Sequence, residues 1–273
     1  MAVARHLHFG RAAAELHIAQ PVLSRQIRAL ENELHAPLFR RDRRSTELTD
    51  AGRQLLADAV PLLAGADALR RRVARSARGP DRFVVGFMPG LIVTDAVRAI
   101  RERHPGLTVD LVRTGWNDQT DVVHDGRVDV SYLRLPVDRR GLTLRPLLTE
   151  PRVAMLPAGH RLAGKETVEI AELADERLLQ DPAAVPEWRD VATIPPDDNP
   201  PTYAVEEKLE HVAAGRGVVV LPLSTARFYT RPDVVWARIT DIAANRVSLA
   251  WEATRRDPLI AEFAALAEQF PAA

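Results

Sequence analysis

The chain has 273 residues, of which 46% are hydrophobic and 27% charged, a composition typical of a soluble globular protein with about two domains. It contains no cysteine, which excludes a disulfide framework and thiolate metal sites. The sequence lacks an apolar run long enough for a membrane span and an N-terminal signal peptide, so we expect a cytoplasmic protein. The net charge is zero overall, but residues 1–80 carry a net +6 and residues 81–273 a net −6. This asymmetry indicates that the first third of the chain meets a polyanion such as nucleic acid.

Residues 9–34 have the pattern of two short helices joined by a tight connection at His17-Ile18-Ala19. Pro21 fits the first turn of the second helix, where its missing N–H costs nothing. The predicted buried stripe of this helix follows spacings of four, three and four: Leu23, Ile27, Leu30 and Leu34. The opposite face carries side chains that can reach base edges and phosphates in a major groove: Gln20, Ser24, Arg25 and Arg28. Taken alone, the pattern leaves open an ordinary helical hairpin with a solvated basic face.

The segment after this hairpin predicts a wing. Pro37 prevents continuation of the helix, Leu38 and Phe39 are apolar anchors, and residues 45–48 can pair back as a short strand. The tip is rich in side chains that suit phosphate or minor-groove contacts: Arg40, Arg41, Arg43 and Arg44. A solvated charged loop is the alternative interpretation.

A long helix is predicted after the wing, with Thr49 as its N-cap and an end near Arg78. Its apolar stripe runs from Leu55 to Val73, which is too long to be buried against one small domain, so the helix needs a partner helix. The Gly79-Pro80-Asp81 segment then separates the two halves of the chain.

The residue identities in the first third of the chain are more specific than their periodicity. The run RAA-x-x-L-H-I-x-Q-P-x-L-S-R-Q-I-x-x-L-E, followed by LFRR and LTDAG, resembles the DNA-binding domain of LysR-type transcriptional regulators from Ala4 to about Gly52. This resemblance implies an N-terminal all-α winged helix-turn-helix at residues 1–49 and a linker or dimerisation helix at 50–79. It also implies a homodimer or homotetramer that binds double-stranded DNA at an inverted-repeat operator and acts on RNA polymerase. The DNA-binding residues would be Gln20, Pro21, Ser24, Arg25, Arg28, Arg40, Arg41, Arg43 and Arg44.

The first helix is shorter than in members of that family, because Met1 enters halfway along it. We expect either a late start of the sequence or a weakened DNA-binding domain. The second case would make the chain a small-molecule-binding protein with impaired DNA binding.

From Arg82 the sequence alternates between short apolar strands and helices, which predicts an α/β domain with a largely parallel sheet. We expect two lobes, the first at about 82–149 and 234–273, with a strand at Val234 to Ile239 returning to it, and the second at about 150–233. Two lobes joined by two connections resemble the effector-binding domain of the same family, which is periplasmic-binding-protein-like.

A small-molecule effector, or co-inducer, is expected between the lobes, at the carboxyl ends of the strands. Helix N–H groups after the first strand favour an anion there, although relatives often have a hydroxyl where this chain has Gly90. Trp116 can stack on an aromatic ligand or pack internally, and Arg134 can pair with an effector anion or form a salt bridge between the lobes. The expected contacts are Met88, Pro89, Gly90, Leu91, Trp116, Leu133, Arg134, Gln180 and Thr202.

Catalysis is not predicted. The sequence lacks the G-x-S-x-G, H-E-x-x-H and P-loop motifs, and its eight histidines have no metal-ligand spacing. We therefore expect a regulator without a metal or a resident cofactor.

Overall fold

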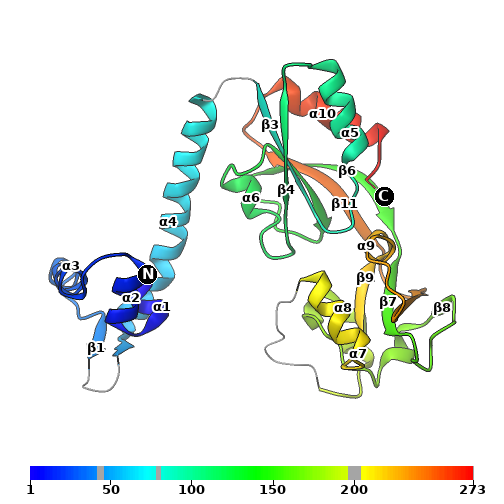
Figure 1. Cartoon of the computed structure of the whole chain (residues 1–273), viewed down its shortest axis with the longest axis horizontal. Helices are drawn as coiled ribbons and strands as arrows, with labels where there is room; N and C mark the ends of the chain where they lie inside the picture. The colour runs from blue at the N-terminus through cyan, green and yellow to red at the C-terminus, as the bar shows by residue number, and fades with distance from the viewer. Residues whose placement is uncertain (42–45, 78–80, 196–203, 273) are drawn as a thin grey trace. The chain divides into compact units, whose positions relative to one another are not determined.

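The computed structural model describes residues 1–41, 46–77, 81–195 and 204–272. Arg43, Arg44 and Thr202, which the sequence places in the two binding sites, lie outside the described residues. The chain divides into two compact units, Met1–Val73 and Ala74–Ala273, each described here by itself (Figure 1). In the described part of the chain, no helix combines the length and the apolar character that crossing a membrane requires.

The first unit is a helix-turn-helix followed by a two-stranded wing and a long helix. His8 caps the second helix by accepting a hydrogen bond from the Arg11 N–H at 3.2 Å. A left-handed residue, His17 (φ 53°), forms the turn into the third helix. The elements are α1 (Ala2–His6), α2 (Phe9–Glu15), α3 (Gln20–Glu33), β1 (Phe39–Arg41), β2 (Thr46–Leu48) and α4 (Asp50–Ala77).

The core of this unit reaches only the first half of α3. Val3, Phe9, Ala12 and Ala13 pack around Leu23, which is buried as predicted. The predicted burial is wrong for the last two positions of the stripe, Leu30 and Leu34, which are 36% and 43% exposed in the single chain. The core cluster around Leu23 includes Ile27 at its margin but neither of these two leucines.

The wing is held to both long helices. Glu31 of α3 accepts hydrogen bonds from the N–H groups of Leu38 (2.9 Å) and Phe39 (3.2 Å). Thr49 caps α4 as predicted, because its hydroxyl accepts from the Gly52 N–H at 3.0 Å. Gly52 admits no side chain, since a Cβ there would lie 2.1 Å from the carbonyl oxygen of Leu38. The start of α4 is therefore fixed against the wing.

The second unit contains two sheets, one in each lobe. The first lobe has the order β4-β3-β5-β11-β6, with β3 parallel to β4 and β5 and with β11 antiparallel to β5 and β6. Helices α5 and α10 pack together beside this sheet (Figure 1). The elements of this lobe are β3 (Arg82–Phe87), α5 (Thr94–Arg103), β4 (Thr108–Arg113), α6 (Asp121–His124), β5 (Val130–Leu135), β6 (Leu142–Glu150), β11 (Asn245–Glu252) and α10 (Pro258–Gln269).

The second lobe has the order β8-β10-β7-β9, mostly antiparallel, with helices around it. Trp188 is its largest fully buried side chain and donates its indole N–H to the Leu173 carbonyl at 3.0 Å. The elements are β7 (Arg152–Pro157), β8 (Thr167–Val168), the 3₁₀ helices η1 (Ile170–Leu173) and η2 (Pro182–Ala184), α7 (Pro186–Val191), α8 (Val205–Ala213), β9 (Val219–Pro222), α9 (Leu223–Phe228) and β10 (Val234–Ile239).

The position of β10 corrects the predicted lobe boundary. We expected Val234 to Ile239 to return to the first lobe, but β10 pairs antiparallel with β7 and parallel with β8 in the second. The chain returns only at β11, so the lobes comprise residues 82–150 with 245–272, and 151–244. A short apolar strand fits either sheet by its periodicity, and only its pairing decides between them.

Candidate DNA-recognition face and interlobe site

Helix α3 presents its predicted polar face to solvent. Leu23 anchors the helix in the core, while Gln20, Pro21, Arg25 and Arg28 are exposed and Ser24 is half-buried. Pro21 lies in the first turn as expected, and Ala19 provides no side-chain cap. Burial on one side therefore orients the whole polar face outward.

The arginines on this face have no acidic partner among the described residues. In the described part of the chain, neither Arg25 nor Arg28 forms an ion pair, whereas Arg5 binds Glu15 at 3.3 Å and Arg53 binds Asp50. A hydrogen bond from His6 also holds the pKa of Glu15 below its usual value. The positive charge on α3 thus remains available to an external anion.

The wing is only partly described. Arg40 is exposed on β1 opposite Glu47 of β2. Arg41 is the last residue of β1, and Arg43 and Arg44 fall outside the described residues.

Arg134, at the carboxyl end of β5, is fully buried where the two lobes meet. Its guanidinium donates to the Glu150 carboxylate, to Asn245 Oδ1 at 2.7 Å and to Ser224 Oγ at 2.8 Å. Longer hydrogen bonds reach Thr225 Oγ1 at 3.2 Å and the Pro89 carbonyl at 3.3 Å. The salt bridge of Arg134 lies within the first lobe, because Glu150 belongs to the same sheet, and the hydrogen bonds to Ser224 and Thr225 are the ones that cross to the second lobe.

Glu150 supplies the anion at this junction. Its carboxylate also accepts from the Ser224 N–H at 2.7 Å and the Ser224 hydroxyl at 3.1 Å. Burial lowers the pKa of Arg134, and the charge and hydrogen bond of Glu150 oppose that shift. The position expected for an effector anion is therefore occupied by a side chain of the protein itself.

Gly90 forms part of the same contact. It has φ +81°, and a Cβ on it would lie 2.4 Å from the Cα of Thr225 in α9. The Pro89 carbonyl accepts from the Thr225 hydroxyl at 3.1 Å. Helix α5 begins only at Thr94, so the Gly90 turn precedes the helix and does not provide the helix N–H groups expected there for an anion.

Most other predicted effector residues serve the fold in this conformation. Met88, Leu91 and Leu133 are buried in the first lobe, and Gln180 accepts the Val220 N–H at 2.9 Å. Trp116 differs, because it is 40% exposed.

A second contact joins the lobes at the surface. Arg113 of β4 binds Glu206 of α8 at 3.3 Å, and Glu206 also accepts from the Tyr229 hydroxyl at 3.1 Å. Burial and the neighbouring carboxylate raise the pKa of Tyr229. No sequence pattern pointed to these residues, or to Glu150, Ser224, Thr225 and Asn245, because only the fold brings them together.

An outward basic helix on a winged helix-turn-helix, followed by a two-lobed α/β domain, defines a ligand-responsive DNA-binding protein. Two family profiles match the chain: "Bacterial regulatory helix-turn-helix protein, lysR family" over residues 1–53 and "LysR substrate binding domain" over residues 80–271. The chain belongs to the LysR family and is a DNA-binding transcriptional regulator with an effector-binding domain.

Individual relatives agree with this assignment over nearly the whole chain. The chain is 33% identical to the HTH-type transcriptional regulator IlvR of Caulobacter vibrioides, over 94% of this chain and 90% of the relative. It is 28% identical to the Hca operon transcriptional activator HcaR of Escherichia coli, over 98% and 95%. A structure of a mutant OxyR from Corynebacterium glutamicum superposes with a TM-score of 0.58 at 26% identity, covering 98% of this chain and 88% of that one.

The residues described by the structure also contain no cluster of three or more histidine and acidic side chains able to hold a metal ion.

Proposed function

We propose that α3 lies in the major groove of the operator and that Gln20, Pro21, Ser24, Arg25 and Arg28 form its contact face. The wing arginines Arg40, Arg41, Arg43 and Arg44 would contact phosphates or the minor groove beside it. The observation that supports this is the exposure of Arg25 and Arg28 without an acidic partner in the described part of the chain.

The experiment is selection of duplexes from a randomised library by the full chain, followed by anisotropy titration. We expect an inverted repeat whose half-sites lie one or more helical turns apart, because a two-fold dimer presents two recognition helices. A scrambled duplex of equal composition is the control. Recovery of no shared sequence would contradict specific recognition and would favour the alternative of a small-molecule-binding protein.

We infer that the inverted repeat is read by a homodimer formed through α4, with tetramers formed by effector-domain contacts. Leu62, Leu63, Leu69 and Val73 are 72%, 52%, 55% and 62% exposed in the single chain, which is a large apolar area to leave in water. Light scattering on Leu62→Asp/Leu69→Asp should give monomers. Ala57→Asp, on the opposite face of α4, should leave assembly intact. A double variant that stays oligomeric would place the main interface elsewhere.

We propose that the effector acts between the lobes, at the mouth formed by the Pro89-Gly90 turn and Trp116. The Thr114 N–H donates to the Phe87 carbonyl at 2.9 Å, which keeps the ends of β3 and β4 adjacent. Trp116 offers an exposed ring for stacking, so we expect an aromatic or apolar co-inducer rather than a simple carboxylate. Met88, Leu91, Leu133, Arg134 and Gln180 would support this site from beneath, and Thr202 remains a proposed contact.

The lobes touch at Gly90 and Thr225, so a ligand entering there must favour a more open arrangement through its differential affinity. Indole is a suitable neutral aromatic probe. Its thermal shift should be lost in Trp116→Ala and retained in Trp236→Ala, since Trp236 is 41% exposed and lies in the second lobe. Equal shifts in both variants would contradict the assignment.

We also propose that the protein regulates by binding alone, without catalysis, and acts in the cytoplasm on RNA polymerase at the promoter. Transcription in vitro with purified polymerase and a selected operator tests this. Unchanged transcript levels on addition of the chain would contradict it.

A further inference from the structure

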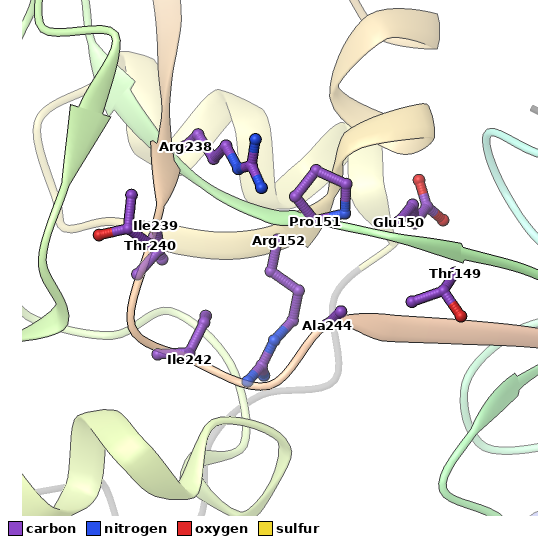
Figure 2. Close-up of a pocket in the computed structure, with 9 residues that line it drawn as sticks. All are labelled: Thr149, Glu150, Pro151, Arg152, Arg238, Ile239, Thr240, Ile242 and Ala244. Carbon is purple, nitrogen blue, oxygen red and sulfur yellow. The ribbon is translucent and has the colours of Figure 1, made fainter.

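A pocket of about 240 Å³ lies against the two segments that connect the lobes (Figure 2). One wall comes from residues 149–152, the first connection, and the other from residues 238–244, which include the second connection. Since a water molecule takes roughly 30 Å³ of liquid volume, the space corresponds to about eight water molecules. A small organic molecule therefore fits.

This pocket shares Glu150 with the interlobe site around Arg134 but extends beyond that site. Asn245 and Glu150 are register partners, and both contact Arg134. Their neighbours Arg246 and Thr149 are the next register pair, and alternation along the strands turns them to the opposite face. Because Thr149 lines the pocket, the pocket reaches the face of the β6–β11 pair that is turned away from Arg134.

The pocket also lies where the two lobes can move relative to each other. Ala243 is fixed to the second lobe, since its carbonyl accepts from Arg152 at 2.8 Å and its N–H donates to Glu187 at 3.0 Å. Asn245 is fixed to the first lobe by Arg134. Only Ala244, which lines the pocket, stands between these two anchored residues.

Among the described residues, Arg238 carries the uncompensated charge of the pocket, because the other charged lining residues are paired, Glu150 with Arg134 and Arg152 with Glu187. Arg238 lines the pocket from the second lobe, and Arg246, exposed on β11 of the first lobe, is the register partner of Thr149. Within the described residues neither guanidinium forms an ion pair or a hydrogen bond, whereas Arg152 binds Glu187 at 2.7 Å. Pro151, Ile239 and Ile242 add apolar surface.

We propose that this pocket binds a small monocarboxylate with a short hydrocarbon body. Arg238 holds the carboxylate, Arg246 adds positive charge from the other lobe, and the apolar wall takes the hydrocarbon. A ligand that touches both lobes here resists their rotation, so the site is a second point of control beside the effector mouth. This second site goes beyond the proposed DNA-binding function, and the experiment that tests the site uses no DNA.

The test is a titration of the full chain, labelled at isoleucine methyl groups, with sodium butyrate at constant ionic strength. We expect saturable shifts of the Ile239 and Ile242 methyl signals. Arg238→Ala should weaken binding about tenfold, the loss of one charge-assisted hydrogen bond, and Arg246→Ala by a smaller factor. Arg101→Ala is the matched control, because Arg101 is exposed on α5 and has no ion pair in the described part of the chain.

Three results would overturn the proposal. The first is methyl shifts that rise linearly with butyrate concentration without saturating, as added chloride would produce. The second is equal butyrate affinity in Arg238→Ala and Arg101→Ala. The third is tighter binding of inorganic phosphate than of butyrate, which would assign the pocket to a different class of anion.

Discussion

The recognition helix and the interlobe junction use arginine in opposite ways. Arg25 and Arg28 are exposed and without an acidic partner among the described residues, whereas Arg134 is buried with five acceptor atoms around its guanidinium. The sequence indicated an anion site in both regions. An arginine at a binding position is available to an external partner only where the fold leaves its charge uncompensated.

The predicted effects differ accordingly. At the junction, removing a charge leaves its buried partner behind, which is costly. On the recognition helix, removing a charge leaves only solvated surface, so the folded protein loses little and the DNA complex loses much.

The largest effect should follow Arg134→Met. This substitution leaves Glu150 buried without its counter-charge, and we expect a loss of about 3–5 kcal/mol in the free energy of unfolding. Urea denaturation measures it.

Two variants control this prediction. Arg134→Met/Glu150→Leu removes both charges and should recover much of the loss. Arg140→Ala breaks the exposed pair with Asp138 and should leave the midpoint unchanged. If Arg134→Met alone were as stable as the unmodified chain, the junction would contribute no stability.

The next effect concerns the contact at Gly90. Gly164→Ala measures the backbone cost alone, about 1–2 kcal/mol, because Gly164 has φ +88° and a Cβ added there would meet open space. Gly90→Ala should cost about 1–3 kcal/mol more, since the new Cβ meets α9. Thermal and urea unfolding measure both losses. If Gly90→Ala lost no more stability than Gly164→Ala, the lobes would not press together at this point.

A smaller effect, confined to DNA binding, should follow Arg25→Ala. We expect operator affinity to fall by about 1–3 kcal/mol through loss of a base or close phosphate contact. The unfolding midpoint should stay the same, because the side chain is exposed. Lower stability with unaltered binding would mean that Arg25 is structural.

The smallest effect is a dependence on pH at the second connection. Burial alone would raise the pKa of Glu187. Hydrogen bonds from backbone N–H groups, including that of Ala243, and then the contact with Arg152 outweigh burial, so the pKa of Glu187 lies below the ordinary 4.5. A carboxyl with a lowered pKa stabilises the fold above its unfolded pKa, and this contribution is lost as pH falls below 4.5.

Glu187→Gln should therefore reduce stability at neutral pH and flatten the acid limb of the stability profile. Glu102→Gln, at an exposed position of α5, is the control and should reproduce the profile of the unmodified chain. Parallel profiles for all three proteins would contradict the role of Glu187.

Sequence reasoning succeeded where structure is local. The helix pattern around Leu23, the cap at Thr49 and the wing follow from neighbouring residues, and each is present. It failed where distant residues decide: the lobe of β10 depends on its pairing with β7. Glu150 meets Arg134 only after β5, β11 and β6 have assembled into one sheet, so no spacing in the chain could have revealed that the anion position was already filled.

The most direct test compares affinities for the selected operator and a scrambled duplex, measured by anisotropy for the unmodified chain and for Arg25→Ala/Arg28→Ala. If the recognition helix carries the free charge that reads DNA, the double variant should lose roughly two orders of magnitude of this preference while its unfolding midpoint stays fixed. An unchanged preference for the operator in the double variant would contradict the assignment of α3 as the reading element.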